Sequence, residues 1–172
     1  MVNGIMRPYR GPKLTASVRN RPFWNKNKTL PLGGCLKVTF DHGIDGDTAS
    51  FVVEGEMKTV RFFVIDTPEL SPKPAPFGLS AKQYTTQKLQ DAKEIYLQSD
   101  KLDSLFDSTE RRRLLAWIWV DGELLNYQLV RLGLATVKYV NNDKMAYLKA
   151  LKEAEKQAKK EGLGLHSQQE VA

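Results

Sequence analysis

The stretch KTVRFFVIDTPE, residues 58–69, decides the fold of this 172-residue chain. Its centre, residues 60–65, is apolar at every position except Arg61. A strand that is apolar on both faces belongs to a closed barrel or to a sheet covered by a helix. A charged group in such a strand needs an anionic partner. For Arg61 that partner is either Asp66 or Asp47 in a structural ion pair, or a phosphate, which a guanidinium binds through two parallel hydrogen bonds.

Arg61 and Asp66 are hard to bring together on one regular strand. They are five residues apart, which is roughly 16 Å along an ideal strand, and by parity their side chains lie on opposite faces. A β-bulge or a strong twist between them is therefore required if both side chains contact one ligand.

The other apolar segments extend this strand into a small barrel. Runs rich in Val, Ile, Phe and Thr predict five strands, at residues 37–40, 48–53, 58–65, 94–98 and 114–120. Three helices are expected, one capped by Ser80 and running to about Lys93, a short one capped by Asn126, and one on the apolar stripe from Met145 to Gly162. The order is typical of an OB barrel. The predicted fold is mainly β with α (α+β), a five-stranded OB-fold barrel with three helices.

The composition excludes several kinds of site. The single cysteine, Cys35, rules out an internal disulfide and a cysteine zinc cluster, and two histidines argue against a histidine-rich metal site. Any metal is therefore expected to be a hard cation bound by oxygen. No run approaches the roughly 18 apolar residues of a membrane span, so no membrane partner is expected. The first residues lack the apolar core of a secretory signal, which predicts a cytoplasmic protein, or a secreted one if a leader is missing.

The positive charge is concentrated at the N-terminus. The net charge is +6, yet the first 40 residues contain eight basic residues and no acidic residue, while the remaining 132 hold 18 basic and 20 acidic residues. Residues 1–33 are predicted to be a basic, flexible arm, 34–166 the folded domain and 167–172 a C-terminal tail. Such an arm favours a polyanionic partner, or it is a solvated tail, or Phe23 and Trp24 dock it on the barrel.

Two carboxylates stand at predicted strand ends, where the rim of a barrel brings side chains together. Asp47 follows the turn at Gly46, and Asp66 ends the central apolar strand. Two carboxylates, a backbone carbonyl and water make a suitable Ca²⁺ site. The alternative is that Asp45 and Asp47 form a turn and that Asp66 caps the turn before Pro68.

Two further residues are candidates for chemistry. Glu69 leaves the strand at an angle set by Pro68, and a carboxylate within one water of a metal can act as a general base; otherwise it is a surface loop residue. Arg113 precedes a buried strand and could bring a second positive charge to a phosphate. The alternative for the triplet at 111–113 is a solvated basic patch.

These segments resemble the staphylococcal nuclease (thermonuclease) family. The similarity covers about Lys37 to His166 and rests on six segments in register: IDGDT, RFFVIDTPE, RLLAWIW from Arg113, DG at 121–122, LVRLGLATVKYV and AEKQAKKEGLGLH. The resemblance implies a five-stranded OB barrel with three helices. It also implies a hydrolase that cleaves DNA and RNA to 3′-phosphorylated products.

The resemblance assigns roles residue by residue. It implies that Asp47 and Asp66 bind Ca²⁺ through their carboxylates and Thr67 through its backbone carbonyl. It implies that Glu69 is the candidate general base. The other implied roles are phosphate binding and transition-state stabilisation by Arg61 and Arg113, and a place in the nucleotide pocket for Tyr139.

The chain also departs from the family pattern. Arg111 and Arg112 stand where the family usually has a tyrosine and a glycine, and Thr109 replaces the usual acid, with Asp107 close by. A tryptophan common near the C-terminus appears as His166. The full acid and arginine set nevertheless favours a Ca²⁺-dependent nuclease, acting as a monomer on DNA, RNA or both. The alternative is a non-catalytic OB-fold module that binds nucleic acid.

Overall fold

The computed structural model describes residues 30, 32–101 and 103–167. Nearly all of the predicted arm, including Phe23 and Trp24, and all but the first residue of the predicted tail lie outside this range, so the domain boundaries stay predictions. None of the helices formed by the described residues combines the length and the hydrophobicity needed to cross a bilayer.

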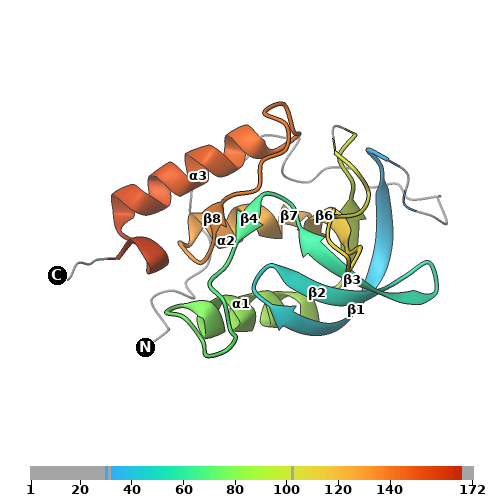
Figure 1. The fold of residues 1–172 in the computed structure, drawn as a ribbon, viewed down its shortest axis with the longest axis horizontal. Helices are drawn as coiled ribbons and strands as arrows, with labels where there is room; N and C mark the ends of the chain where they lie inside the picture. Colours follow the sequence, from blue (N-terminus) through green and yellow to red (C-terminus); the bar gives the residue numbers. More distant parts are fainter. Residues whose placement is uncertain (1–29, 31, 102, 168–172) are drawn as a thin grey trace.

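Five strands close into a barrel (Figure 1). They are β1 (Cys35–Asp45), β2 (Thr48–Val53), β3 (Glu56–Phe62), β5 (Ile95–Gln98) and β6 (Leu114–Val120). The order is β3-β2-β1-β5-β6, and a parallel pairing between β3 and β6 joins the two edges. A short strand, β7 (Glu123–Leu124), extends the sheet beyond β6. The predicted OB-type barrel is confirmed.

Three α-helices accompany the barrel, as expected. They are α1 (Gly78–Gln90), α2 (Leu125–Arg131) and α3 (Leu148–Glu161), followed by a short 3₁₀ helix, η2 (Gly164–His166). Helix α1 packs on β1, whereas α2 packs on β6 and on α3. In Figure 1, α1 lies along the lower edge and α3 along the upper left, with β4 and β8 between them.

Two predicted helix starts are wrong. Helix α1 begins at Gly78 after Phe77, which has a left-handed φ of 67°, so Ser80 lies inside the helix and is not its cap. Asn126 also lies inside its helix rather than capping it. Its side chain is fully buried and hydrogen-bonds to residues outside the helix, so it does not cap the first turn, the role that asparagine favours at a helix start.

The core contains an aromatic cluster whose polar atoms are satisfied. Trp117 and Trp119 of β6 are fully buried, and both rings stand edge-on to the ring of Tyr147, with centroids 5.1 and 5.5 Å away. The Trp119 indole and the Tyr147 hydroxyl both donate to Gln98, each at 2.8 Å. Trp117 donates to Asp100 at 3.1 Å. Burying these large apolar rings stabilises the fold, and the hydrogen bonds remove the cost of burying their N–H and O–H groups.

The predicted continuous strand from 58 to 65 is broken. Strand β3 ends at Phe62, a turn follows at Phe63 and Val64, and the chain re-enters a short strand, β4 (Ile65–Asp66). That strand pairs with β8 (Thr136–Val137) in a separate two-stranded sheet. Val64 has a φ of 49°, a conformation that a β-branched residue strongly disfavours and that surrounding contacts must impose.

Candidate active site

Hydrogen bonds from three elements fix the turn between β3 and β4. The amide of Phe63 donates to the Ala116 carbonyl of β6 at 2.9 Å, and the Phe63 carbonyl accepts from the Asn126 side chain of α2 at 3.0 Å. The Val64 carbonyl accepts from the amide of Lys138, just after β8, at 3.0 Å. The strained turn is therefore determined by the tertiary structure and not by its own sequence.

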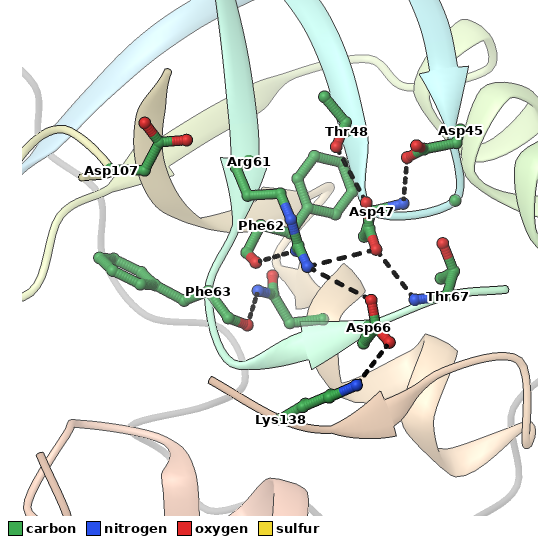
Figure 2. A network of polar contacts seen from close by, with 12 residues as sticks. Asp45, Asp47, Thr48, Arg61, Phe62, Phe63, Asp66, Thr67, Asp107 and Lys138 are labelled. Atoms are coloured by element: carbon green, nitrogen blue, oxygen red, sulfur yellow. Dashed lines mark hydrogen bonds and ion pairs between the residues drawn. The ribbon is translucent and has the colours of Figure 1, made fainter. Parts of the chain in front are cut away.

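The turn brings Asp66 back beside Arg61 (Figure 2). The Nη2 atom of Arg61 lies 3.4 Å from Asp47 Oδ2 and 3.7 Å from Asp66 Oδ1, and Nη1 donates to the Phe62 carbonyl at 2.8 Å. The two carboxylate oxygens lie within 3.7 Å of one nitrogen, so they are separated by less than twice that distance. The structure thus forms the ion pairs considered for Arg61. The break in the strand brings Asp66 back to Arg61, although an ideal strand would separate the two residues by roughly 16 Å.

Asp47 is held rigidly at the start of β2. Its side chain is nearly buried and accepts from the Thr48 hydroxyl and from the Thr67 amide, each at 2.9 Å. The preceding Gly46 permits this approach, because a Cβ there would lie 2.6 Å from Ala81 of α1 and 2.7 Å from Thr67. Packing of α1 against this turn therefore sets the position of Asp47.

Asp45 adds a third carboxylate beside Asp47. Its Oδ1 atom accepts from the Asp47 amide at 3.1 Å, as expected for a turn-forming aspartate. Burial, followed by the proximity of the Asp47 carboxylate, raises the pKa of Asp45 to about 7. The negative charge at this turn is therefore concentrated enough that one carboxylate resists ionisation.

The oxygen atoms around Asp47 and Asp66 suit a hard cation. The described residues include no group of three or more His, Cys, Asp or Glu side chains arranged to hold a metal. The predicted set needs only two carboxylates and the Thr67 carbonyl. The Thr67 hydroxyl is buried beside them without a hydrogen-bond partner, and the donors are all oxygen, as Ca²⁺ prefers. The residues present therefore fit the implied ion.

Glu69 and Tyr139 are exposed, whereas Asp47 is buried and Asp66 is half-buried. Within the described part of the chain, the Glu69 carboxylate has neither a hydrogen bond nor an ion pair to protein, so it is available to accept a proton from water. Tyr139 is 60% exposed. Its ring lies 5.6 Å from the Arg61 guanidinium and 5.2 Å from the Lys138 ammonium.

Arg113 lines the same cleft and is paired with Asp107. Its Nε atom donates to Asp107 Oδ2 at 2.6 Å, and its amide donates to Oδ1 at 3.1 Å. Burial opposes ionisation of Asp107, but the hydrogen bonds and charge of Arg113 outweigh it and lower the pKa of Asp107. Nη1 and Nη2 of Arg113 have no protein partner among the described residues. Arg111 and Arg112 are exposed, as expected.

An open cleft of about 1390 Å³ joins these groups. Six of the seven predicted site residues line it. The exception is Thr67, whose amide donates a hydrogen bond to Asp47. The cleft has carboxylates on the side formed by β2 and β4 and arginines from β3 and from the start of β6. The structure thus brings the predicted residues together, while their individual roles stay predictions.

Sequence reasoning missed two residues of this site. Asn126 fixes the turn before Asp66, and Lys138 lies 3.6 Å from Asp66. From the sequence alone, Asn126 is interpreted as a helix cap, and Lys138 is interpreted as a solvent-exposed charge. The first contact follows from the packing of α2 against the turn and the second from the pairing of β4 with β8.

Known proteins with similar sequences agree with this geometry. The sequence profile described as "Staphylococcal nuclease homologue" matches residues 59–168. The SPbeta prophage-derived endonuclease YokF and the endonuclease YncB of Bacillus subtilis (strain 168) are each 36% identical over 140 residues, or 77% of this chain. The chain spans only 44% of YokF and 62% of YncB. A thermonuclease of Staphylococcus intermedius is 33% identical over 127 residues, covering 71% of each chain. The chain therefore belongs to the staphylococcal nuclease homologue family.

Proposed function

We propose that this protein is a Ca²⁺-dependent nuclease that hydrolyses phosphodiester bonds of DNA, RNA or both. The observation that carries the proposal is the cleft, in which the carboxylates of Asp47 and Asp66, a glutamate that has no partner among the described residues, and two arginines line one space. The family relationship and the names of similar proteins, two endonucleases and a thermonuclease, support the same activity. A module that only binds nucleic acid has no need of this combination.

Asp47, Asp66 and the Thr67 carbonyl are the residues that would hold Ca²⁺. When bound, the ion would supply positive charge to a phosphate oxygen and lower the pKa of a nearby water. Asp47 is suited to this role because its side chain is already fixed by Thr48 and Thr67. A side chain that is already ordered loses less conformational entropy when it binds an ion.

Glu69 is the candidate general base. It accepts a proton from the attacking water, whose oxygen forms a bond to phosphorus as the bond to the 5′-oxygen breaks. The 5′-oxygen leaves as a hydroxyl after taking up a proton, and the phosphate remains on the 3′-oxygen of the other fragment. Water is the only co-reactant.

Arg61 and Arg113 stabilise the charge that grows on the phosphate. The two free Nη atoms of Arg113 form a fork that matches two phosphate oxygens. Arg61 already lies among the carboxylates, so it can share its donors between them and a phosphate. Tyr139, exposed at the edge of the cleft, offers an aromatic face to the adjacent base.

The decisive experiment is an assay of acid-soluble nucleotide release from DNA and from RNA. We expect release with Ca²⁺, loss of release with a chelator, and a rise in melting temperature with Ca²⁺ because the ion binds the folded state. The Glu69→Gln variant is the matched control for cleavage. Tight binding of nucleic acid without cleavage at any Ca²⁺ concentration would instead identify a binding module.

A further inference from the structure

Lys138 lies beside Asp66, one of the two carboxylates predicted to bind the metal. Its ammonium lies 3.6 Å from Asp66 Oδ2, while Arg61 lies 3.7 Å from Asp66 Oδ1. Both oxygens of Asp66 therefore face a cation (Figure 2). A Ca²⁺ ion at either oxygen would lie close to one of these cations, and the repulsion between like charges favours movement of one of the two away from Asp66.

The backbone of Lys138 is fixed at the end of β8. Its amide donates to the Val64 carbonyl, and the amide of Val137 donates to Glu155 of α3 at 2.7 Å. Asp66 lies opposite Thr136 in the β4–β8 pair, so Lys138 is its diagonal neighbour on the same face. Diagonal neighbours are about 7–8 Å apart, a distance that a lysine stem can span.

The side chain of Lys138 is much freer than that of Arg61. It is 56% exposed, and its ammonium is a compact charge on a flexible stem. The Arg61 side chain is 12% exposed and is also bonded to the Phe62 carbonyl. Lys138 is therefore the cation that can leave Asp66 at the lower cost.

A second group that attracts the ammonium lies close by. In its present position beside Asp66, the Lys138 ammonium is 5.2 Å from the ring centroid of Tyr139, and Tyr139 lines the cleft. A phosphate next to a base on Tyr139 would lie within reach of the same flexible stem. Lys138 thus stands between the predicted metal ligands and the predicted nucleotide pocket.

We propose that Lys138 is a mobile counter-ion that neutralises Asp66 in the metal-free protein and moves to a substrate phosphate once a divalent cation binds. The inference rests on the proposed function for the identity of the cation and of the phosphate. Lys138 then has two opposite effects: it weakens metal binding when no nucleotide is present, and it strengthens nucleotide binding when the metal is present.

The size of the first effect follows from charge and distance. A dication and an ammonium about 6 Å apart in a water-exposed site repel each other enough to change affinity roughly tenfold. Salt reduces this, since exposed charges are screened over about 8–10 Å. Removing the lysine charge is therefore expected to tighten Ca²⁺ binding by about threefold to tenfold.

The test compares Lys138→Gln with Lys138→Arg, which keeps the charge. The control is Lys58→Gln, because Lys58 also pairs with a carboxylate, Glu56 at 3.0 Å, but Glu56, unlike Asp66, does not line the cleft. Calorimetry gives the Kd for Ca²⁺ without nucleotide. The same instrument gives the Kd for a nucleoside 3′-phosphate, a product-like ligand that is not cleaved, at saturating Ca²⁺.

We expect Lys138→Gln to lower the Kd for Ca²⁺ by about threefold to tenfold and to raise the nucleotide Kd by a similar factor. Lys138→Arg should stay near wild type and Lys58→Gln should not differ from it. Weaker or unchanged Ca²⁺ binding in Lys138→Gln overturns the counter-ion role, and an unchanged nucleotide Kd overturns the move to phosphate. A wild-type protein that binds no Ca²⁺ refutes the proposed metal dependence itself, and the inference with it.

Discussion

Replacing Asn126 with alanine tests whether tertiary contacts build the site. The Asn126 side chain is fully buried and makes two hydrogen bonds, accepting from the Ile118 amide at 2.9 Å and donating to the Phe63 carbonyl at 3.0 Å. Asn126→Ala leaves both backbone groups buried without a partner. Each such group costs about 1–3 kcal/mol, so the free energy of unfolding should fall by about 2–6 kcal/mol.

A neighbouring buried amide provides the control. Gln128 lies on the same helix and is 1% exposed, but its Oε1 already has no partner among the described residues. Its Nε2 donates to Glu123, which is partly exposed and can turn to water. Gln128→Met should therefore cost no more than about 1 kcal/mol.

Urea denaturation with linear extrapolation measures both variants. A third variant, Asn126→Asp, keeps the acceptor for Ile118 and places a buried carboxylate opposite the Phe63 carbonyl, so the lost bond and the cost of burying a charge both act on the turn. We expect Asn126→Asp to lose stability and nuclease activity together, since a looser turn misplaces Asp66. If Asn126→Ala were as stable as Gln128→Met, the turn would not depend on α2 and the argument would be wrong.

The remaining predictions concern the cleft and the N-terminal arm. Glu69→Gln should lower kcat by about 10²–10⁴ with little change in KM; near-normal turnover would make Glu69 an ordinary loop residue. Arg113→Lys should slow cleavage of a dinucleotide, because an ammonium cannot form a fork with two phosphate oxygens, and a wild-type rate would remove Arg113 from the phosphate. Arg112→Ala should reduce the salt dependence of binding by at most about one unit, as for a surface phosphate contact. Its guanidinium lies 4.9 Å from the Phe106 ring and outside the Arg113–Asp107 pair. Removing residues 1–33, which leaves 19 basic and 20 acidic residues, should weaken binding to long nucleic acid and flatten its salt dependence. Cleavage of a dinucleotide should not change, whereas a loss of thermal stability at constant salt slope would mean that the arm is a structural clasp.

The barrel could be predicted from sequence because its signals are local. Alternation and apolar runs mark all five strands, and the apolar stretch around Arg61 requires burial on both faces. The break at Phe63 and Val64 could not be predicted in the same way. Every side chain in the run favours an extended strand, and the turn exists because β6, α2 and β8 bond to it.

The sequence identified most of the residues that line the candidate site, but only some of the contacts between them. Carboxylates at strand ends and a charged residue in an apolar strand point to Asp47, Asp66 and Arg61 without a structure. Arg113 and Asp107 pair across the five loop residues between them, and the contact of Lys138 with Asp66 depends on a strand pair of two residues each. The first contact follows from loop conformation and the second from a pairing between distant segments, and sequence periodicity encodes neither.

The C-terminal helices are part of the site rather than additions to the barrel. Asp66 belongs to β4, which is paired only with β8 among the described strands. Strand β8 is fixed in turn by Glu155 of α3, and α3 is tied to α2 by the two hydrogen bonds between Arg131 and Glu161, at 3.0 and 2.8 Å. A barrel without these helices would keep Asp47 next to β2 and Arg61 on β3 but would lose the support for Asp66. If the proposed function is right, destabilising α3 should reduce metal-dependent cleavage more than nucleic-acid binding, because only the proposed cleavage requires both carboxylates at one point.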